Sequence, residues 1–261
     1  MNIVVCIKQV PDTTEVKINP QTNTLMREGV PSIINPFDMY AIEEGLRLRE
    51  RFGGRVTLLT MGPPQAKDAL REALGLGADA AVLLSDRAFA GADTLATSTT
   101  LAKGVEKVGN VDLVICGKQA ADGDTAQVGP GTAERLGWPH TSFVRKIHEV
   151  AGGSIKLERM TETGYEVVEM RLPAVITVVK EINEPRLPSL KGQIRAKSAE
   201  IPAWTAADLG ATPEQLGLSG SPTQVVRIFT PERRSGGKIL EGSLAEQLDF
   251  LVARLRETKA V

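Results

Sequence analysis

Short, almost continuously apolar runs alternate with segments of helical periodicity along the first half of this chain. The apolar runs lie at residues 2–8, 55–61, 80–84 and 111–116. Such runs are typical of strands that are buried on both faces of a parallel sheet. The segments between them predict helices over residues 36–51, from about 64 to 77, and from Asp93 to Val108. Because strand and helix alternate, the sequence predicts an α/β fold in which helices cover a parallel sheet.

The predicted helices carry start and stop signals. Asn35 is placed to cap the first helix, with Pro36 at its first position. Asp93 is placed to cap the third helix with its carboxylate. Gly75 and Gly77 are expected to end the second.

The second half of the chain is less regular. Residues 155–159 and 165–171 predict a hairpin, and 174–180 predicts another buried strand. Residues 183–222 are rich in Pro, Gly and Ser and have little periodicity, so we expect them to lie outside the core sheet. Residues 240–256 carry leucines on one helical stripe. We therefore predict two domains, an α/β domain over 1–222 and a C-terminal arm over 223–261.

Composition narrows the functional classes. The chain has 261 residues and a formal net charge of -1, which argues against a broad nucleic-acid or membrane surface. No apolar stretch approaches the ~20 residues that span a bilayer, and no secretion signal is visible at the start. Cys6 and Cys116 form no CxxC pair, and each is predicted to be buried in a strand. A cytoplasmic protein without membrane insertion is expected.

The segment after the fourth apolar run is the richest candidate for ligand binding. In open parallel sheets ligands bind at the carboxyl ends of strands. Residues 117–133 combine glycines, hydroxyls and amides and lead into a helix, an arrangement that suits a phosphate. Asp122 and Asp124 are expected to act as caps or ribose contacts. A plain surface loop explains this segment equally well, and a capped helix start explains residues 35–38.

Several motifs of covalent chemistry or nucleotide binding are missing. The sequence has neither GxGxxG after the first strand nor GxxxxGK[ST]. Ser235-Gly236-Gly237 is weakly similar to an ATP loop but lies near the C-terminus. His140 and His148 have no partners at metal-ligand spacing, so no metal site is expected. We find no catalytic residues and expect a chain that holds a nucleotide.

Taken together, these segments resemble the β subunit of electron-transfer flavoproteins. Gly117-Lys118-Gln119-Ala120, then Asp122–Gly129, and far downstream Asn183-Glu184-Pro185-Arg186 carry the resemblance. It implies a Rossmann-like, doubly wound, mostly parallel sheet of the adenine-nucleotide-binding type with a C-terminal helical arm. It also implies a heterodimer with an α subunit that holds FAD, while the β subunit of ordinary carriers binds AMP. The implied contacts are Cys6, Asn35, Pro36, Phe37, Asp38, Met61, Asp122, Gly123, Asp124, Thr125, Ala126, Gln127, Val128, Gly129, Pro130, Gly131, Thr132 and Ala133.

Two further segments resemble the subgroup that bifurcates electrons. They are Lys8–Thr13 and Asp86–Thr94. In that subgroup the β subunit holds a second FAD in place of AMP and takes hydride from NADH. One electron passes to the α-subunit FAD and an acyl-CoA dehydrogenase, and the other to ferredoxin or flavodoxin. The resemblance adds cofactor contacts at Lys8, Gly91, Ala92, Asp93 and Thr94, and Gly91-Ala92 is expected to leave room for the flavin.

Alternatives to this interpretation stay open for the function and for two of the segments. The chain can be a simple carrier that binds AMP, or a non-redox domain that senses adenine nucleotides. Residues 184–197 resemble the loop that recognises an acyl-CoA dehydrogenase, with Leu190 at the anchoring position, although Leu187–Lys191 departs from the family pattern and the partner can differ. Without the resemblance, Leu190 is simply a leucine folded onto the surface. The C-terminal leucines resemble the arm that packs on the α subunit, and a core helix is the alternative.

Overall fold

The computed structural model describes residues 1–12, 31–226 and 237–260. The chain divides into two compact units, Met1–Val226 and Arg227–Val261. Thr13, at the end of one segment that resembles the bifurcating subgroup, lies outside the described residues, as do Ser235 and Gly236.

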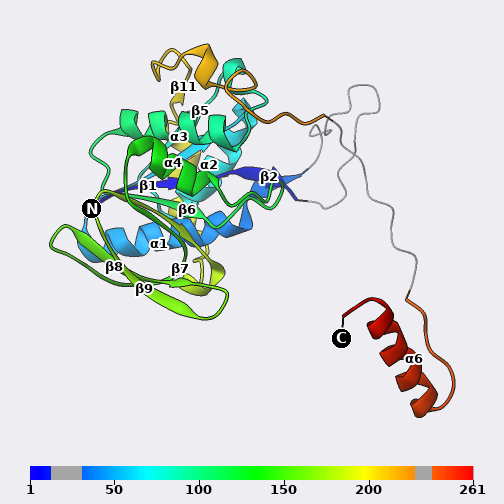
Figure 1. The fold of residues 1–261 in the computed structure, drawn as a ribbon. Coiled ribbons are helices and arrows are strands. Elements are labelled where there is room, and N and C mark those ends of the chain that lie inside the picture. The colour runs from blue at the N-terminus through cyan, green and yellow to red at the C-terminus, as the bar shows by residue number, and fades with distance from the viewer. Residues whose placement is uncertain (13–30, 227–236, 261) are drawn as a thin grey trace. The chain divides into compact units, whose positions relative to one another are not determined.

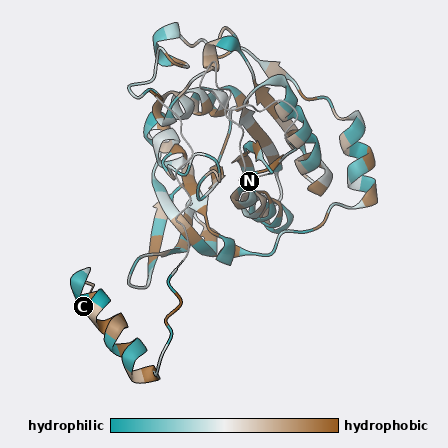
Figure 2. Ribbon diagram, turned by 90° about the vertical axis from the view of Figure 1, so that its right-hand side faces the viewer, coloured by the Kyte–Doolittle hydropathy of each residue, from teal (hydrophilic) through white to brown (hydrophobic). Residues whose placement is uncertain are grey.

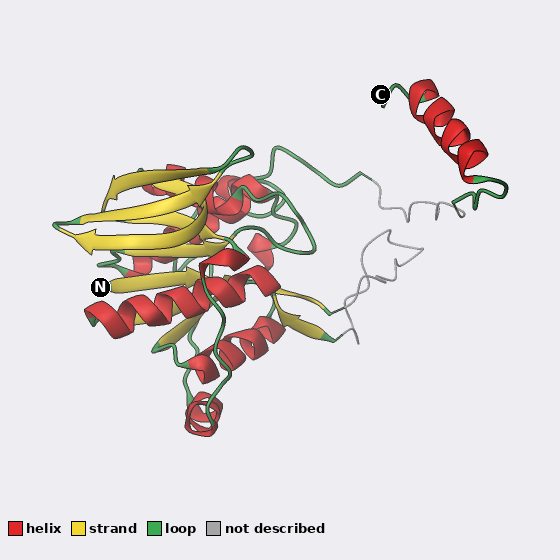
Figure 3. Cartoon of the chain, turned by 90° about the horizontal axis from the view of Figure 1, so that it is seen from below, coloured by secondary structure: helices red, strands yellow, loops and turns green. Residues whose placement is uncertain are grey.

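The first unit is built on a nine-stranded sheet with the order β11-β5-β4-β1-β6-β10-β7-β8-β9. The strands from β11 to β7 in this order run parallel, and β8 and β9 add an antiparallel hairpin at one edge. Figure 3 shows these strands in yellow. Their bounds are β1 Asn2–Cys6, β4 Arg55–Met61, β5 Ala80–Leu84, β6 Leu113–Gly117, β7 His140–Ala151, β8 Ser154–Met160, β9 Tyr165–Arg171, β10 Ala174–Val178 and β11 Ala203–Trp204.

Helices cover both faces of the sheet (Figure 1). On one face α1 (Pro36–Phe52) and α2 (Lys67–Leu76) contribute to the hydrophobic cluster that contains Ile3 and Val5 of β1. On the other, α3 (Thr94–Val108) and α4 (Val128–Leu136) contribute to the cluster that contains Val4. Alternate residues of β1 thus enter different hydrophobic clusters, because side chains alternate along a strand. The predicted doubly wound, mostly parallel α/β fold is confirmed.

Figure 2 shows apolar residues concentrated on the central strands, with polar residues on much of the outward helix surface. That distribution explains why the strands were recognisable as continuous apolar runs, since both of their faces are covered. The short 3₁₀ helices η1 (Pro64–Ala66), η2 (Arg87–Phe89), η3 (Lys180–Ile182) and η4 (Pro213–Gln215) lie in the connections.

Several elements differ from the prediction. β7 was not predicted, because its half-buried residues show no clean alternation and its register with β8 shifts twice. The region 183–222 was predicted outside the sheet, yet β11 pairs with β5, and α5 (Leu190–Ser198) forms a helix with Ala196 as its one buried residue. β2 (Gln9–Pro11) and β3 (Ser32–Ile34) form a small separate sheet.

The second unit contains α6 (Leu244–Glu257). Ser243 caps its first turn and Glu246 completes a capping box. Leu244, Leu248 and Leu251 are each about half exposed or more, so the described residues of this unit do not cover these three positions of the predicted apolar stripe. In the part of the chain that the structure describes, no helix is both long and apolar enough to cross a membrane.

Candidate functional site

The strand order of the sheet reverses beside β1. From β1 the chain passes to β4 and β5 on one side, and it returns with β6 on the other side. The register pairs Cys6 of β1 with Cys116 of β6, so these strands end side by side. In open parallel sheets, ligands bind in the crevice at such a reversal, outside the carboxyl ends of the strands. The segments that follow β1 and β6 therefore form the candidate site.

Asp38, in the first turn of α1, places a buried carboxylate between these strand ends. The residue is 5% exposed, and its Oδ2 accepts a hydrogen bond of 2.7 Å from the backbone N–H of Lys8. The N–H of Gly117 donates to the same carboxylate, and a Cβ at Gly117 would overlap with it. Burial raises the pKa of Asp38 to about 7, although hydrogen bonds from Asn35, Lys8 and Gly117 oppose the shift.

Asn35 connects the start of α1 to the loop after β6. Its Nδ2 donates to the carbonyl of Gln119 at 2.8 Å, and its Oδ1 accepts from the N–H of Ala121 at 3.0 Å. Asn35 occupies the N-cap position of α1, as predicted, but its side chain does not cap the helix; the amide bonds this loop instead. The residue is buried, so both hydrogen bonds are shielded from water.

Nearer the surface, an ion pair joins the segment after β1 to the loop after β6, and a second hydrogen bond lies within that loop. Lys8 Nζ donates to Asp122 Oδ1 at 2.6 Å, and Gln119 Nε2 donates to Asp124. The prediction that these aspartates act as caps is wrong for α4, whose N-cap position is Gln127. Contact of either aspartate with a ribose stays a prediction.

The loop after β6 runs directly into α4, which begins at Val128 rather than near Ala133. No side chain caps its first turn, so the amides at its start suit an anion. Gly129 and Gly131 lie against other elements: an added Cβ would overlap with Thr177 at the first position and would lie 2.5 Å from Ser98 Oγ at the second. These glycines allow close packing of α4, and any contact they make with a ligand must come from the backbone.

Within α4 the predicted contacts turn inward. Thr132 and Ala133 are buried, and Thr132 Oγ1 donates to the carbonyl of Val128 at 2.8 Å. Pro130 is half-buried. The exposed members of the predicted set precede the helix and are Asp122, Gly123, Asp124, Thr125 and Gln127. Ala126, which is half-buried, has a positive φ of 55°.

The segment after β5 comes close to this loop, and the room that Gly91-Ala92 was expected to leave for a flavin stays a prediction. Gly91 has a φ of 74°, and a Cβ there would lie 3.3 Å from the side chain of Leu218. Asp93 caps α3 as predicted, through Leu95 and Ala96, and its other oxygen accepts from Thr223. These bonds outweigh burial and lower its pKa.

Thr94 connects the two loops. Its Oγ1 donates to Thr125 Oγ1 at 3.3 Å. Ala92, just before α3, is half-buried. The structure thus brings the segments after β1, β5 and β6 together at one edge of the sheet, as the sequence predicted.

The remaining predicted residues border this edge. The Cys6 side chain points into the hydrophobic cluster beneath α3 and α4. The pKa of Cys116 is raised by its hydrogen bond with Cys6 and by burial. Met61 is half-buried at the end of β4, and Pro36 is exposed at the first position of α1.

Two residues of this edge were not predicted as site residues. Lys118 Nζ lies 5.9 Å from the ring centroid of Phe37 and 5.7 Å from that of Phe143, within the range of cation–π attraction. Phe143 has a φ of 63°, which is unusual for an aromatic residue. Lys118 belongs to the quoted Gly117–Ala120 motif and could have been found; nothing local in the sequence indicated Phe143.

A separate arrangement supports the segment around Leu190. Arg186 forms ion pairs with Glu43 at 2.7 Å and with Glu50 at 2.5 Å. Asn183 Nδ2 donates to Glu44 at 3.0 Å and to the carbonyl of Tyr40. Burial raises the pKa of Glu43, but hydrogen bonds from arginines outweigh it and the pKa is lowered.

These bonds fix the chain against α1 just before α5. Leu187, Leu190 and Ile194 follow and are 89%, 75% and 62% exposed. We call these three residues the α5 patch. Leu190 is thus exposed rather than folded back onto the surface.

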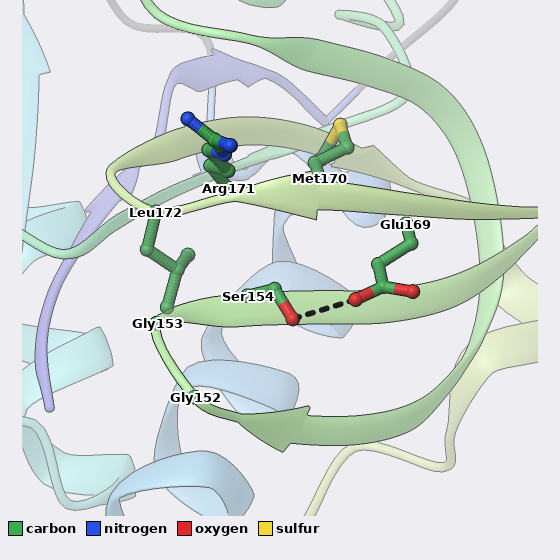
Figure 4. Close-up of a pocket in the computed structure, with 7 residues that line it drawn as sticks. All are labelled: Gly152, Gly153, Ser154, Glu169, Met170, Arg171 and Leu172. Atoms are coloured by element: carbon green, nitrogen blue, oxygen red, sulfur yellow. Dashed lines mark hydrogen bonds between the residues drawn. The ribbon is translucent and has the colours of Figure 1, made fainter.

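The hollow at the β7–β9 edge of the sheet lies apart from the candidate site. A hollow of about 410 Å³ lies where the turn between β7 and β8 meets the end of β9 (Figure 4). Ser154 Oγ donates to Glu169 at 2.8 Å across it, and none of the predicted site residues lines it. Among the described residues, no group of three or more His, Cys, Asp or Glu side chains could hold a metal ion.

The fold and this edge define a doubly wound α/β protein with a candidate ligand crevice at its strand reversal. Residues 22–209 match the family described as electron transfer flavoprotein domain. The chain is 53% identical to the electron transfer flavoprotein subunit beta of Thermoanaerobacterium thermosaccharolyticum, over 100% of both chains. It is 51% identical to the caffeyl-CoA reductase-Etf complex subunit CarD of Acetobacterium woodii, over 98% of both. It is 50% identical to protein FixA of Azorhizobium caulinodans, over 98% of this chain and 94% of that one. The chain belongs to the electron transfer flavoprotein family, as a β subunit.

Proposed function

We propose that this chain pairs with an electron transfer flavoprotein α subunit, binds FAD at the carboxyl edge of its sheet, and bifurcates electrons from NADH. One electron goes toward the α-subunit FAD and an acyl-CoA dehydrogenase, and the other to ferredoxin or flavodoxin, in the cytoplasm. FAD would supply the redox chemistry, and the protein would bind and orient it.

The observation that carries this proposal is the way buried polar groups hold the crevice. Asn35 and Asp38 connect α1 to the segments after β1 and β6. The segment after β6 leads into the uncapped start of α4, where a phosphate would meet backbone amides and the positive end of the helix dipole. The residues present therefore fit the phosphate portion of FAD or of AMP.

Bifurcation is supported by relatives and by two sequence segments. A relative that covers nearly the whole chain is named for a complex with caffeyl-CoA reductase, which is consistent with a partner that acts on CoA thioesters. Residues 8–13 and 86–94 resemble the bifurcating subgroup. The alternative, structural AMP without NADH chemistry, is favoured by one observation: Leu218 lies against Gly91, where the larger cofactor was expected to need room. Membership of the family argues against an isolated nucleotide sensor.

Partner binding is assigned to two apolar surfaces. The α5 patch, with Leu190 at its centre, would bind the acyl-CoA dehydrogenase, since a rigidly supported and exposed leucine suits a small interface hot spot. The exposed leucines of α6 would pack on the α subunit.

The test is to co-purify the chain with its α subunit and count the nucleotides released on denaturation. We expect two FAD per heterodimer and reduction of flavin by NADH without oxygen. One FAD with one AMP would contradict the bifurcation proposal and support a simple electron carrier that binds structural AMP. A Lys8→Ala variant, which loses the ion pair to Asp122, should lose nucleotide from this chain only. Lys107→Ala, whose lysine contacts Trp204, is the matched control.

A further inference from the structure

Two carboxylates hold opposite ends of β1. At the amino end, Asp112 Oδ2 accepts from the N–H of Asn2 at 2.7 Å. At the carboxyl end, Asp38 accepts from the N–H groups of Lys8 and Gly117. Asp38 differs from Asp112 because it is almost fully buried and bridges two strands that lead into the candidate site. A rigid bridge of this kind fixes the distance between the two segments that follow.

The surroundings of Asp38 contain few charges. From the end of β1 the ammonium of Lys8 favours its ionised form, and from β6 the Cys116 thiol, paired with Cys6, faces it. Asn35 contributes a neutral hydrogen bond. Desolvation outweighs these contacts and raises the pKa of Asp38 to about 7. Both protonation forms are therefore populated near neutral pH.

The two forms cannot make the same hydrogen bonds. An ionised carboxylate accepts with both oxygens, whereas a protonated one carries a donor on one of them. Lys8 and Gly117 both present N–H donors, so a proton on Asp38 competes with one of these two bonds. Loss of either bond frees the start of a segment that forms the site.

We propose that Asp38 is a positioning residue of the nucleotide site: its ionised carboxylate holds the ends of β1 and β6 in the geometry that binds the nucleotide, and its protonation loosens them. This inference rests on the proposed function. Binding of the nucleotide then favours the ionised form, so binding near pH 7 releases a proton. Affinity falls as the pH decreases through 7.

The experiment uses the heterodimer with the α subunit, stripped of nucleotide and titrated separately with FAD and AMP at pH 6, 7 and 8. Calorimetry in buffers of different ionisation enthalpy counts the protons released. For the wild type we expect binding about tenfold weaker at pH 6 than at pH 8, the size of one hydrogen bond to a charged group. Asp38→Asn should bind weakly at every pH and release no proton. Asp112→Asn, the matched control, should keep the wild-type profile.

Two results overturn the inference: a wild-type profile that is flat with pH, or one that Asp38→Asn retains. A wild type that binds neither FAD nor AMP at any pH overturns the proposed function as well, which separates the two failures. If Asp38→Asn does not fold, hydrogen exchange of the wild type at pH 6 and pH 8 gives the answer. Exchange at residues 7–12 and 117–121, corrected for intrinsic rates, should be faster at pH 6, and equal protection would contradict the inference.

Discussion

The carboxyl edge of the sheet and the α5 patch depart from ordinary burial in opposite ways. At the edge, polar groups such as Asn35 and Asp38 are buried. On the α5 patch, large apolar side chains are exposed. A buried polar group or an exposed apolar patch is more informative than a buried leucine. Each region is fixed to α1 by hydrogen bonds, so one helix supports both the candidate ligand crevice and the proposed docking surface.

The largest effect should come from the charge of Asp38. Its folded-state pKa of about 7 lies above the ordinary value of about 4. Between these values the unfolded chain has lost a proton that the folded chain keeps, so stability falls as the pH rises. We expect the unfolding free energy of the wild type, relative to Asp38→Asn, to fall by about 1.4 kcal/mol per pH unit from pH 5 to about pH 6, and by about half that slope at pH 7. Urea unfolding at several pH values measures it; parallel curves would mean that Asp38 is not buried as described.

Packing of α4 gives the next largest effect. Gly129→Val would place methyl groups where Thr177 already lies, and overpacking of this kind costs about 2–3 kcal/mol. Gly123→Ala is the control, since its Cβ would meet nothing closer than Lys8 Nζ at 4.0 Å. Thermal unfolding should separate the two variants by several degrees, and equal melting temperatures would show that α4 adjusts freely.

One buried asparagine, Asn35, and one half-buried asparagine, Asn183, test whether the regions are independent. Asn35→Ala leaves the Gln119 carbonyl and the Ala121 N–H without their partner, and Asn183→Ala does the same at Tyr40. Each should cost about 2 kcal/mol. Asn35→Ala should weaken nucleotide binding and leave the dehydrogenase interaction unchanged, and Asn183→Ala should do the reverse.

Binding assays for both partners on both variants check this separation. If each variant weakens both interactions equally, α1 couples the two regions. The view that the crevice and the α5 patch act independently would then be wrong.

Much of the fold could be predicted because it depends on local patterns. The strands over 55–61 and 80–84 and the helix capped by Asp93 were predicted with their observed bounds. Elements that depend on partners elsewhere were missed: β7 shows no clean alternation of buried and exposed residues, and β11 is two residues long. α5 was missed because most of its residues are exposed.

The candidate site divides in the same way. Its position at the ends of β1 and β6 followed from the alternation of strands and helices. Its connections did not, because Asn35 binds residues 84 and 86 positions further along the chain. The preference of asparagine for the N-cap position predicted that this side chain caps α1. In the structure the side chain instead bonds the distant loop after β6. The same holds for Gly91, whose neighbour Leu218 is far away in sequence.

The smallest effect on stability, and the sharpest test of the docking surface, should come from Leu190→Ser. This side chain is 75% exposed, so the unfolding free energy should change by less than about 0.5 kcal/mol. Electron transfer to the acyl-CoA dehydrogenase should nevertheless need a higher partner concentration, by about tenfold, as for a hot-spot residue. Val167→Ser, on the exposed side of β9 at 56% exposure, is the matched control and should leave that concentration unchanged. If both variants behave like the wild type, the exposed leucine is not the anchor, and the bonds from Asn183 and Arg186 to α1 only support a loop.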